Sequence, residues 1–285
     1  MSPPSNSPDF PDWAFAPAAA TGYCVDFIRD TLQGSGHRRL VVGLSGGIDS
    51  AVAAGLAVRA VGADQVTGLM LPYTTSSPAS LTDARAVAGA LDMKVETVDI
   101  TPMVDAFGED LPDADALRRG NIMARCRMIV LYDRSAAEGA LVLGTGNRTE
   151  GLLGYTTLYG DNACGLNPLG QLYKTEIRLL ADFLDLPRVV LDKAPSADLW
   201  QGQADEDELG FTYAQADAIL HALVDEGLGL ERVAALGHAP ELVQRIAARM
   251  AAMTFKRISP PVALLPGRRD PDGAAHQPAV DGGFH

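Results

Sequence analysis

One short run of residues combines an apolar strand pattern with a glycine turn, two hydroxyls and a carboxylate. It spans residues 41–50 and reads VVGLSGGIDS. Adjacent glycines let the backbone approach an anion closely, and a helix start directs N–H groups and positive partial charge toward it. Ser45 and Ser50 add hydroxyl donors, and Asp49 offers a hard oxygen ligand for the magnesium ion that accompanies a nucleotide. The run therefore predicts a site for the phosphates of ATP.

Two other nucleotide-binding motifs are missing at this turn. A Walker loop requires GxxxxGK[ST], whose lysine reaches the β- and γ-phosphates, and no such stretch occurs in the sequence. The dinucleotide fingerprint GxGxxG is not found at this turn either. A tight strand-to-helix turn that needs two glycines is the alternative interpretation. The serines and the aspartate around the glycines favour phosphate binding over that alternative.

Composition limits the class of protein and its partners. With 285 residues, 47% of them hydrophobic, the chain can bury the core of one large α/β domain with additions. Its formal net charge of −13 disfavours nucleic acid and anionic membrane surfaces as partners. The sequence contains no apolar run of membrane-spanning length and no signal-peptide pattern. The 3 cysteines form no CxxC pair and the 5 histidines show no metal-ligand spacing. We therefore expect reduced thiols, a cytoplasmic location and no zinc site.

The chain divides into a central domain with two extensions. Residues 1–17 are rich in proline and polar side chains and predict a flexible arm, part of which Phe10, Trp13 and Phe15 could pin to the body. Proline, glycine, charge and alanine dominate 266–285, which predicts a disordered tail. The domain is expected over 18–265.

Strands and helices alternate within this domain. We expect strands at 40–44, 66–71, 95–100 and 141–143, and helices at 18–32, 48–61, 81–91 and 116–137. This alternation is typical of an α/β fold with a doubly wound parallel sheet and flanking helices. Ligands of such sheets bind beyond the carboxyl ends of the strands, where the strand order reverses. If the first strand is central and the fourth lies beside it, Asp49 and Glu150 meet there as a magnesium site.

Further motifs follow the fourth expected strand. They are GTGNRTE at 144–150, YGD at 159–161, NPLG at 167–170, LYKTE at 172–176, KAPSADLW at 193–200 and DEDELG at 205–210. SGGIDS resembles the pyrophosphate loop of ATP pyrophosphatases. In order with the later motifs, it resembles the ammonia-dependent NAD synthetase family over 18–261. The resemblance implies a Rossmann-like fold of the adenine nucleotide alpha hydrolase type.

The same resemblance implies a two-step reaction. The nicotinate carboxylate of deamido-NAD attacks the α-phosphate of ATP, which gives an acyl adenylate and pyrophosphate. Ammonia then attacks the adenylate to give NAD and AMP. Positioning and charge neutralisation around phosphate carry such catalysis.

Site residues follow from the motifs that match. Asp49 and Glu150 are implied to hold Mg²⁺, and Lys174 to neutralise phosphate charge as a point cation. Arg125 is implied to contact deamido-NAD, with Arg127 as the alternative, in a homodimer whose second subunit completes the site. The ATP-binding residues implied in this way are Gly43, Leu44, Ser45, Gly46, Gly47, Ile48, Asp49, Ser50, Thr145, Lys174 and Ser196, with Asp161 a weaker candidate for a second metal ion.

The sequence departs from the family pattern near the acceptor. Leu158 stands where many members carry a lysine, Gly165 where they carry an aspartate, and Phe255-Lys256 where they carry His-Lys. These departures leave adenylation intact and put the identity of the acceptor acid in question. The segment before SGGIDS is shorter than a glutaminase domain, so we expect free ammonia, or a separate glutaminase, as the nitrogen source.

Two other functions are compatible with the phosphate-binding run. One is an ATP pyrophosphatase that adenylates another carboxylate or tRNA; the acidic net charge counts against tRNA. The other is a nucleotide-binding module without catalysis, which would not need Asp49, Glu150 and Lys174. Several site residues also have a structural alternative: Lys174 as a solvated helix charge, Ser196 as a helix cap, and Thr145 as a strand end. Arg125 and Arg127 could instead pair with acidic side chains on a long helix.

Overall fold

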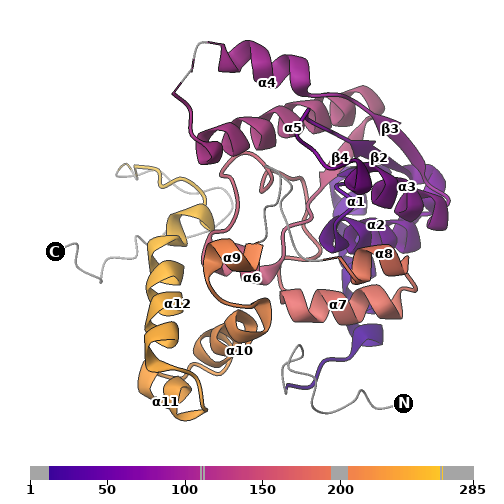
Figure 1. Ribbon diagram of the computed structural model, residues 1–285. Helices are drawn as coiled ribbons and strands as arrows, with labels where there is room; N and C mark the ends of the chain where they lie inside the picture. The colour runs from indigo at the N-terminus through magenta and orange to yellow at the C-terminus, as the bar shows by residue number, and fades with distance from the viewer. Residues whose placement is uncertain (1–12, 110, 112, 194–204, 264, 266–285) are drawn as a thin grey trace.

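A four-stranded parallel sheet forms the centre of the molecule, as the computed structural model shows (Figure 1). The structure describes residues 13–109, 111, 113–193, 205–263 and 265. The strands are β1 (Arg39–Gly43), β2 (Val66–Met70), β3 (Lys94–Thr97) and β4 (Ala140–Leu143), in the order β3-β2-β1-β4. Each neighbouring pair is parallel, and Leu40 of β1 pairs with Val66 of β2 and with Leu141 of β4.

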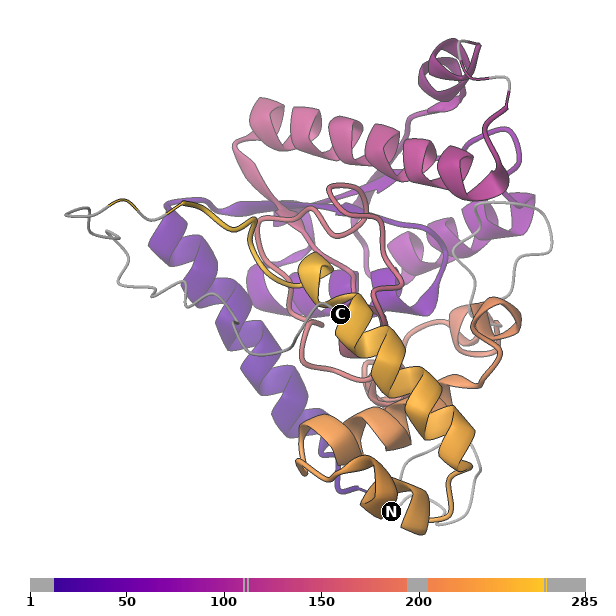
Figure 2. The same cartoon turned by 90° about the vertical axis from the view of Figure 1, so that its left-hand side faces the viewer.

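Helices cover both faces of this sheet. The first face carries α2 (Ile48–Val61), α3 (Pro78–Ala90) and α1 (Pro17–Ser35), and the second carries α4 (Thr101–Gly108) and α5 (Ala116–Glu138). Successive side chains of β1 point to opposite faces: Leu40 and Val42 join the core under α1 and α2, whereas Val41 joins the core under α5. Figure 2 shows α5 on the opposite side of the sheet from α1. The predicted doubly wound α/β fold is confirmed.

The strand order reverses at β1. From β1 the chain proceeds to β2 and β3 on one side, and β4 then returns to the other side of β1. The loops that follow β1 and β4 therefore open at one edge of the sheet, beside a topological switch point. This is the arrangement that the meeting of Asp49 and Glu150 requires.

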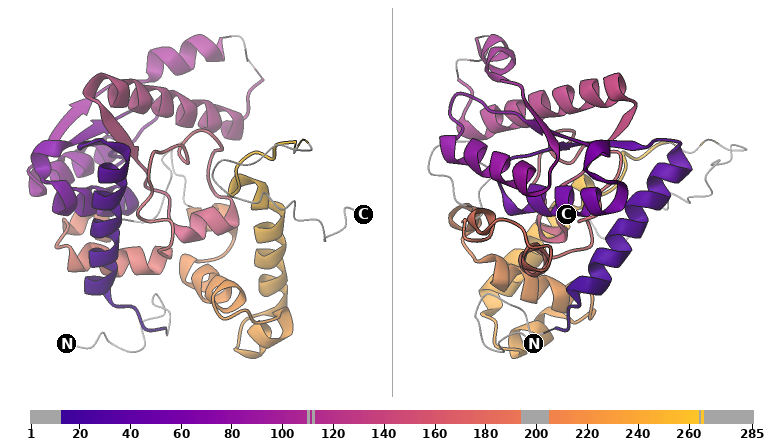
Figure 3. Two further views of the ribbon diagram at one scale, coloured as in Figure 1. Left: turned by 180° about the vertical axis from the view of Figure 1, so that it is seen from behind. Right: turned by 90° about the vertical axis from the view of Figure 1, so that its right-hand side faces the viewer.

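A second group of helices packs beside the sheet. After α6 (Arg148–Leu153), α7 (Lys174–Phe183) and the short α8 (Arg188–Leu191) lie near α2, and α9 (Asp205–Leu209), α10 (Tyr213–Val224), α11 (Leu230–Ala235) and α12 (Pro240–Ala252) continue the chain. Two 3-10 turns span Ala63–Gln65 and Thr254–Lys256. The later helices have an apolar core of their own, in which Leu153 of α6 packs with Ile219 and Leu220 of α10. Figure 3 shows this group from behind and from the side.

Each of the strands and helices expected from the sequence is present, and the third strand differs most in extent. The sequence predicts this strand as far as Ile100, but β3 ends at Thr97 and α4, which the sequence does not predict, begins at Thr101. The chain still follows β2 between them, because the backbone N–H of Val98 donates to Met70 O at 2.9 Å and that of Ile100 to Pro72 O at 3.0 Å. Helix α4 is too short to produce a clear apolar period in the sequence.

The predicted arm and tail lie largely outside the described residues, which exclude 1–12 and 266–285. Trp13, at the end of the predicted arm, does contact the body. Its Nε1 donates to Glu176 Oε1 at 2.7 Å, and its ring stacks on His221 at a centroid distance of 4.2 Å. Across the described part of the chain, no helix is both long and apolar enough to cross a bilayer.

Candidate functional site

The residues between β1 and α2 form a tight turn, which we call the phosphate loop (residues 43–50). The N–H of Leu44 donates to Leu69 O at 2.8 Å and so extends the sheet pairing by one residue. Gly46 then adopts a φ of +76°, and a Cβ at this position would meet Ser80 O at 2.2 Å. Since no side chain fits so close to another backbone, the loop requires glycine at 46.

Two serines hold the phosphate loop in shape from inside. Ser50 Oγ accepts from the N–H of Ser45 at 3.3 Å, lies 3.1 Å from Ser45 Oγ and donates to Gly47 O at 2.9 Å. Helix α2 then begins after Gly47, and no side chain of the described residues caps this first turn. The early N–H groups of α2 and its positive end are therefore suited to an anion.

A lysine and two carboxylates meet beside this loop. Lys174 Nζ forms an ion pair with Asp49 Oδ2 and lies 3.5 Å from Glu150 Oε1. Asp49 is the second residue of α2, Glu150 follows β4, and Lys174 begins α7. The structure thus brings together three predicted site residues that are far apart in the sequence.

Local sequence fixes how these three side chains are presented. Asn147 and Glu150 form a capping box at the start of α6: Asn147 Oδ1 accepts from the N–H of Glu150 at 2.9 Å, and Glu150 Oε2 from the N–H of Asn147 at 3.2 Å. Asn147 Nδ2 also donates to Asp49 Oδ1 at 2.8 Å. Lys174 Nζ lies 5.1 Å from the centre of the Tyr213 ring, a cation–π arrangement.

Burial makes the electrostatics of this cluster strong. The side chain of Lys174 is only 4% exposed. Burial alone would lower the pKa of Lys174, but Asp49 and Glu150 outweigh it and hold the pKa above its usual value, so the side chain stays a cation. Burial, together with the negative charge of Asp49, raises the pKa of Glu150 to about 8, against the opposing effect of Lys174. The two carboxylates are close enough to repel each other, and a cation between them relieves that repulsion.

The donor set fits a magnesium ion. Asp49 and Glu150 approach the same ammonium, so their oxygens converge on one point beside the phosphate loop. Mg²⁺ is commonly held by one or two carboxylates together with substrate phosphates and water. No group of three or more metal-ligating side chains occurs in the described part of the chain.

All of the other predicted site residues except Ser196 lie within the described part of the chain. Thr145 directly follows Gly144 in the loop after β4. Arg125, on α5, donates from Nη2 to Leu158 O at 3.1 Å, whereas Arg127 donates from Nε to Leu71 O at 3.0 Å just beyond β2. Asp161 accepts from the N–H of Thr157 at 2.7 Å. Ser196 lies outside the described residues.

Two of the positions that depart from the family pattern, Gly165 and Lys256, make hydrogen bonds to backbone groups of the protein. Gly165 joins the edge of β4 through its N–H, which donates to Val142 O at 2.8 Å, and a Cβ there would touch Leu141 at 3.4 Å. Lys256 donates to Gly154 O at 2.8 Å and Thr156 O at 2.6 Å, on the segment that leads to Leu158. Lys256 therefore stabilises the conformation of the loop that contains Leu158.

Sequence reasoning missed several residues of the site. Asn147 carries a recognisable signal, because an asparagine three residues before a glutamate is the pattern of a capping box. Lys193 stands in the KAPSADLW motif, but the motif alone does not indicate what its side chain contacts. Asp217 and Tyr213 lie on α10, where nothing in the sequence distinguishes a buried acid or phenol from a surface one.

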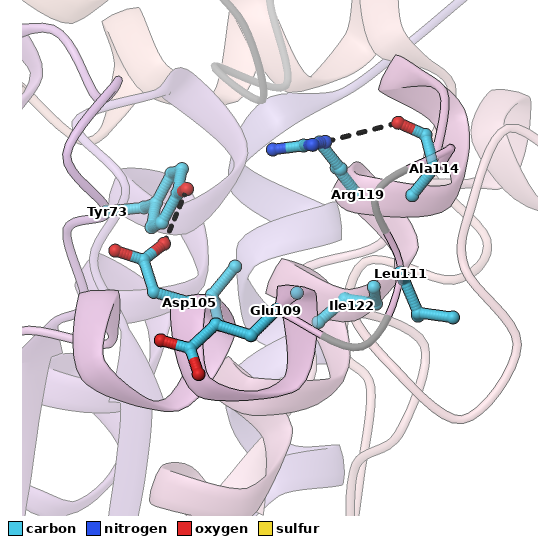
Figure 4. Close-up of a pocket in the computed structure, with 9 residues that line it drawn as sticks. Tyr73, Asp105, Glu109, Leu111, Ala114, Arg119 and Ile122 are labelled. Carbon is cyan, nitrogen blue, oxygen red and sulfur yellow. Dashed lines mark hydrogen bonds between the residues drawn. The ribbon is translucent and has the colours of Figure 1, made fainter.

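A separate cavity lies on the second face of the sheet (Figure 4). Its volume is about 240 Å³, and the loop after β2, α4 and the start of α5 line it. Tyr73 Oη donates to Asp105 Oδ1 at 2.9 Å, and Arg119 Nε to Ala114 O at 3.1 Å. None of the predicted site residues lines this cavity, so it is not the phosphate site.

Comparisons with known proteins agree with this geometry. The family model described as NAD synthase matches residues 21–260. The NH(3)-dependent NAD(+) synthetase of Chlorobaculum parvum is 48% identical over 244 residues, which cover 86% of this chain and 88% of that protein.

Two solved structures are similar over nearly their full length. The NH3-dependent NAD synthetase of Campylobacter jejuni, solved with a nitrate ion, has a TM-score of 0.75 at 34% identity, covering 88% of this chain and 100% of that one. An NMN synthetase from Francisella tularensis has a TM-score of 0.77 at 35% identity, covering 90% and 100%. The likeness therefore extends over the sheet, the phosphate loop and the later helices together.

Proposed function

Because the chain belongs to the NAD synthase family, we propose that it is an ammonia-dependent NAD synthetase, a ligase that forms a C–N bond at the expense of ATP. Deamido-NAD, ATP and ammonia are its substrates, and NAD, AMP and pyrophosphate are its products. The reaction passes through an acyl adenylate, which converts a carboxylate into a group that ammonia attacks readily.

One observation supports this function above the others: Lys174, Asp49 and Glu150 meet beside the phosphate loop. A module that only binds nucleotide needs hydrogen bonds and apolar contacts. Burying a cation and two carboxylates carries a desolvation penalty, and simple nucleotide binding does not require it. Adenylation uses all three groups, because negative charge develops on the departing pyrophosphate.

Each residue of the site takes a role in this proposal. Residues 43–50 and Thr145 bind the phosphates of ATP, and Ser196 joins them. Lys174 neutralises charge on the phosphates, since its ammonium stays protonated and is fixed by burial. Arg125, near the middle of α5, contacts deamido-NAD on the side of the helix where it meets Leu158.

Asp49 and Glu150 are proposed to hold Mg²⁺. The ion supplies a compact positive charge on the phosphates when ATP is bound. Asn147 keeps the Asp49 carboxylate aligned through its Nδ2, and the capping box keeps Glu150 aligned.

The activity is tested by measuring pyrophosphate release and NAD formation with purified protein. Pyrophosphate release should require deamido-NAD, and NAD should form with ammonium chloride as the nitrogen source. Release that does not depend on any acceptor acid would contradict the proposal. Efficient use of glutamine by the protein alone would contradict the assignment of ammonia as nitrogen donor.

A second acceptor is worth testing in the same assay. The Francisella NMN synthetase is as similar to this chain as the Campylobacter NAD synthetase is, and Leu158 and Gly165 stand at positions implied to touch the acceptor. An enzyme that makes NMN amidates the mononucleotide rather than deamido-NAD. A ratio of kcat/KM that favours nicotinate mononucleotide would assign the chain to that activity.

A homodimer is proposed on the exposed face of α5. Leu117, Ile129 and Tyr132 of this helix are exposed by 63%, 52% and 41%, and exposed apolar side chains gathered on one element can mark a protein–protein interface. The substitution Ile129→Asp should shift the mass measured by light scattering from dimer to monomer, and a monomeric wild-type chain would exclude this interface.

The free thiols of Cys24, Cys126 and Cys164 support a cytoplasmic location for the enzyme.

A further inference from the structure

A buried carboxylate, that of Asp217, contacts the neighbours in sequence of two site residues, Glu150 and Lys174. Asp217 of α10 is 0% exposed, and its carboxylate accepts three hydrogen bonds. Oδ1 accepts from Thr149 Oγ1 at 2.5 Å, and Oδ2 accepts from the N–H and from Oγ1 of Thr175, both at 2.8 Å. Charged acceptors make the stronger hydrogen bonds of a protein interior.

The donors of these bonds flank the two charged side chains of the site. Thr149 directly precedes Glu150 at the start of α6, and Thr175 directly follows Lys174 at the start of α7. Thr149 Oγ1 also accepts from the N–H of Lys174 at 3.0 Å. One carboxylate and one hydroxyl thus join the first turns of α6 and α7 to each other and to α10.

We propose that Asp217 is a positioning residue that sets the separation of Glu150 and Lys174, and that it acts through Thr149 and Thr175. This inference rests on the proposed function, because it concerns the same site. Asp217 does not contact substrate in this role. It keeps two helix starts in one arrangement, so that the glutamate and the lysine meet the phosphates together.

The chemistry of the network explains why a carboxylate is needed. A hydroxyl has one hydrogen to donate, and Thr149 Oγ1 already accepts from Lys174, so its hydrogen must go to Asp217. An ionised carboxylate only accepts, and it satisfies all three donors at once. An amide at this position would direct an NH₂ group at one of the hydroxyls and leave a donor without an acceptor.

Asp217→Asn is the direct test. We expect it to lower kcat for NAD formation by about 10- to 100-fold at saturating ATP, because small displacements of positioned groups cost that much. The folded fraction at the assay temperature is to be measured by circular dichroism, and kcat is to be expressed per folded molecule. A kcat that is unchanged per folded molecule would overturn the inference, since a merely structural role changes only the unfolding temperature.

A pair of variants keeps the test decisive if Asp217→Asn does not fold. Thr149→Val removes the bridging hydroxyl at nearly constant volume, and Thr149→Ser restores it. We expect kcat to fall with valine and to return to within about threefold of wild type with serine. Equal kcat values for the two variants would overturn the inference.

The chain also offers a matched control. Thr67 is likewise 0% exposed, and its Oγ1 donates to Glu138 Oε2 at 2.9 Å. It is the second residue of β2, at the end of the sheet opposite the phosphate loop. Thr67→Val removes the same kind of bond and should leave kcat unchanged. If the wild-type protein forms no NAD, the proposed function fails; if it is active and all these variants match it, only the inference about Asp217 fails.

Discussion

Lys193 Nζ lies 3.4 Å from the carbonyl oxygen of Gly46, in the middle of the phosphate loop. The same ammonium contacts Ser80 Oγ at 3.1 Å and Asp83 Oδ2 at 2.9 Å, both on α3. At the other end of the same peptide, the N–H of Gly47 donates to Ser45 Oγ at 3.2 Å. A peptide between two glycines rotates easily, and contacts at its carbonyl and its N–H fix which of them faces the ligand.

We therefore expect Lys193→Met to weaken ATP binding. The KM for ATP should rise by about tenfold, the equivalent of 1.4 kcal/mol, with a smaller change in kcat. Lys193→Arg keeps the charge and should recover part of the affinity. Initial rates over a range of ATP concentrations provide the measurement.

A surface lysine serves as the control for Lys193. Lys94 pairs with Glu96 on β3, and its side chain is 58% exposed, so Lys94→Met should leave the KM for ATP unchanged. The orienting role of Lys193 would be refuted if its methionine variant bound ATP as tightly as the wild type.

Gly46→Ala should disable the phosphate loop while the fold persists. The new Cβ would collide with Ser80 O, a backbone atom that cannot rotate away, and the positive φ adds about 1 kcal/mol of strain. We expect ATP binding, followed by calorimetry, to become at least tenfold weaker. Gly36→Ala is a close control, because Gly36 has a similar φ of +73° but no atom within 4 Å of its Cβ position. That variant should lose stability and keep its ATP affinity; equal loss of affinity in both would rule out the steric argument.

The sequence identifies the phosphate loop because local geometry alone dictates it. A strand, two glycines and a helix start occupy consecutive positions, and the structure has β1 end at Gly43 and α2 begin at Ile48. The meeting of Asp49 with Glu150 required one further assumption, that β4 lies beside β1, and that assumption is confirmed. Both inferences use rules that hold for parallel sheets in general.

Asp217 and Lys193 could not be found in this way. An aspartate within a helix is usually solvated, and only the packing of α10 against α6 and α7 buries this one. Lys193 reaches Asp83 and Gly46 across more than a hundred positions of sequence. Contacts of this kind depend on the tertiary fold, which no local pattern encodes.

Asp49→Asn should nearly abolish pyrophosphate release, by about 100-fold or more. The amide can still accept from Asn147, but it carries no charge for Lys174 or for a divalent cation. Release of pyrophosphate with deamido-NAD and ATP is to be followed together with thermal unfolding. Asp26→Asn, at an exposed ion pair on α1, is the matched control and should behave as wild type. Normal activity in Asp49→Asn would refute the assignment of this carboxylate to the site.

The buried carboxylate of Asp217 should make stability depend on pH. Burial is the main reason that its pKa rises from 3.8 to about 6, although the hydrogen bonds from Thr149 and Thr175 oppose the change. A carboxyl whose pKa is higher in the folded state favours folding while it is protonated. That contribution is complete below about pH 4 and is lost as the pH rises through about 6.

Comparing the wild type with Asp217→Asn isolates this effect, because the amide does not titrate. Between pH 5 and pH 7.5 the free energy of unfolding of the wild type should fall relative to that of the variant by about 1.5 kcal/mol. Urea unfolding of both proteins at several pH values gives the difference directly. Asp182→Asn, at an ion pair exposed on both sides, should shift stability by less than about 0.5 kcal/mol at any pH in this range. A constant difference between the wild type and Asp217→Asn would mean that Asp217 is ionised at the same pH in the folded and unfolded chains, and the burial argument would then fail.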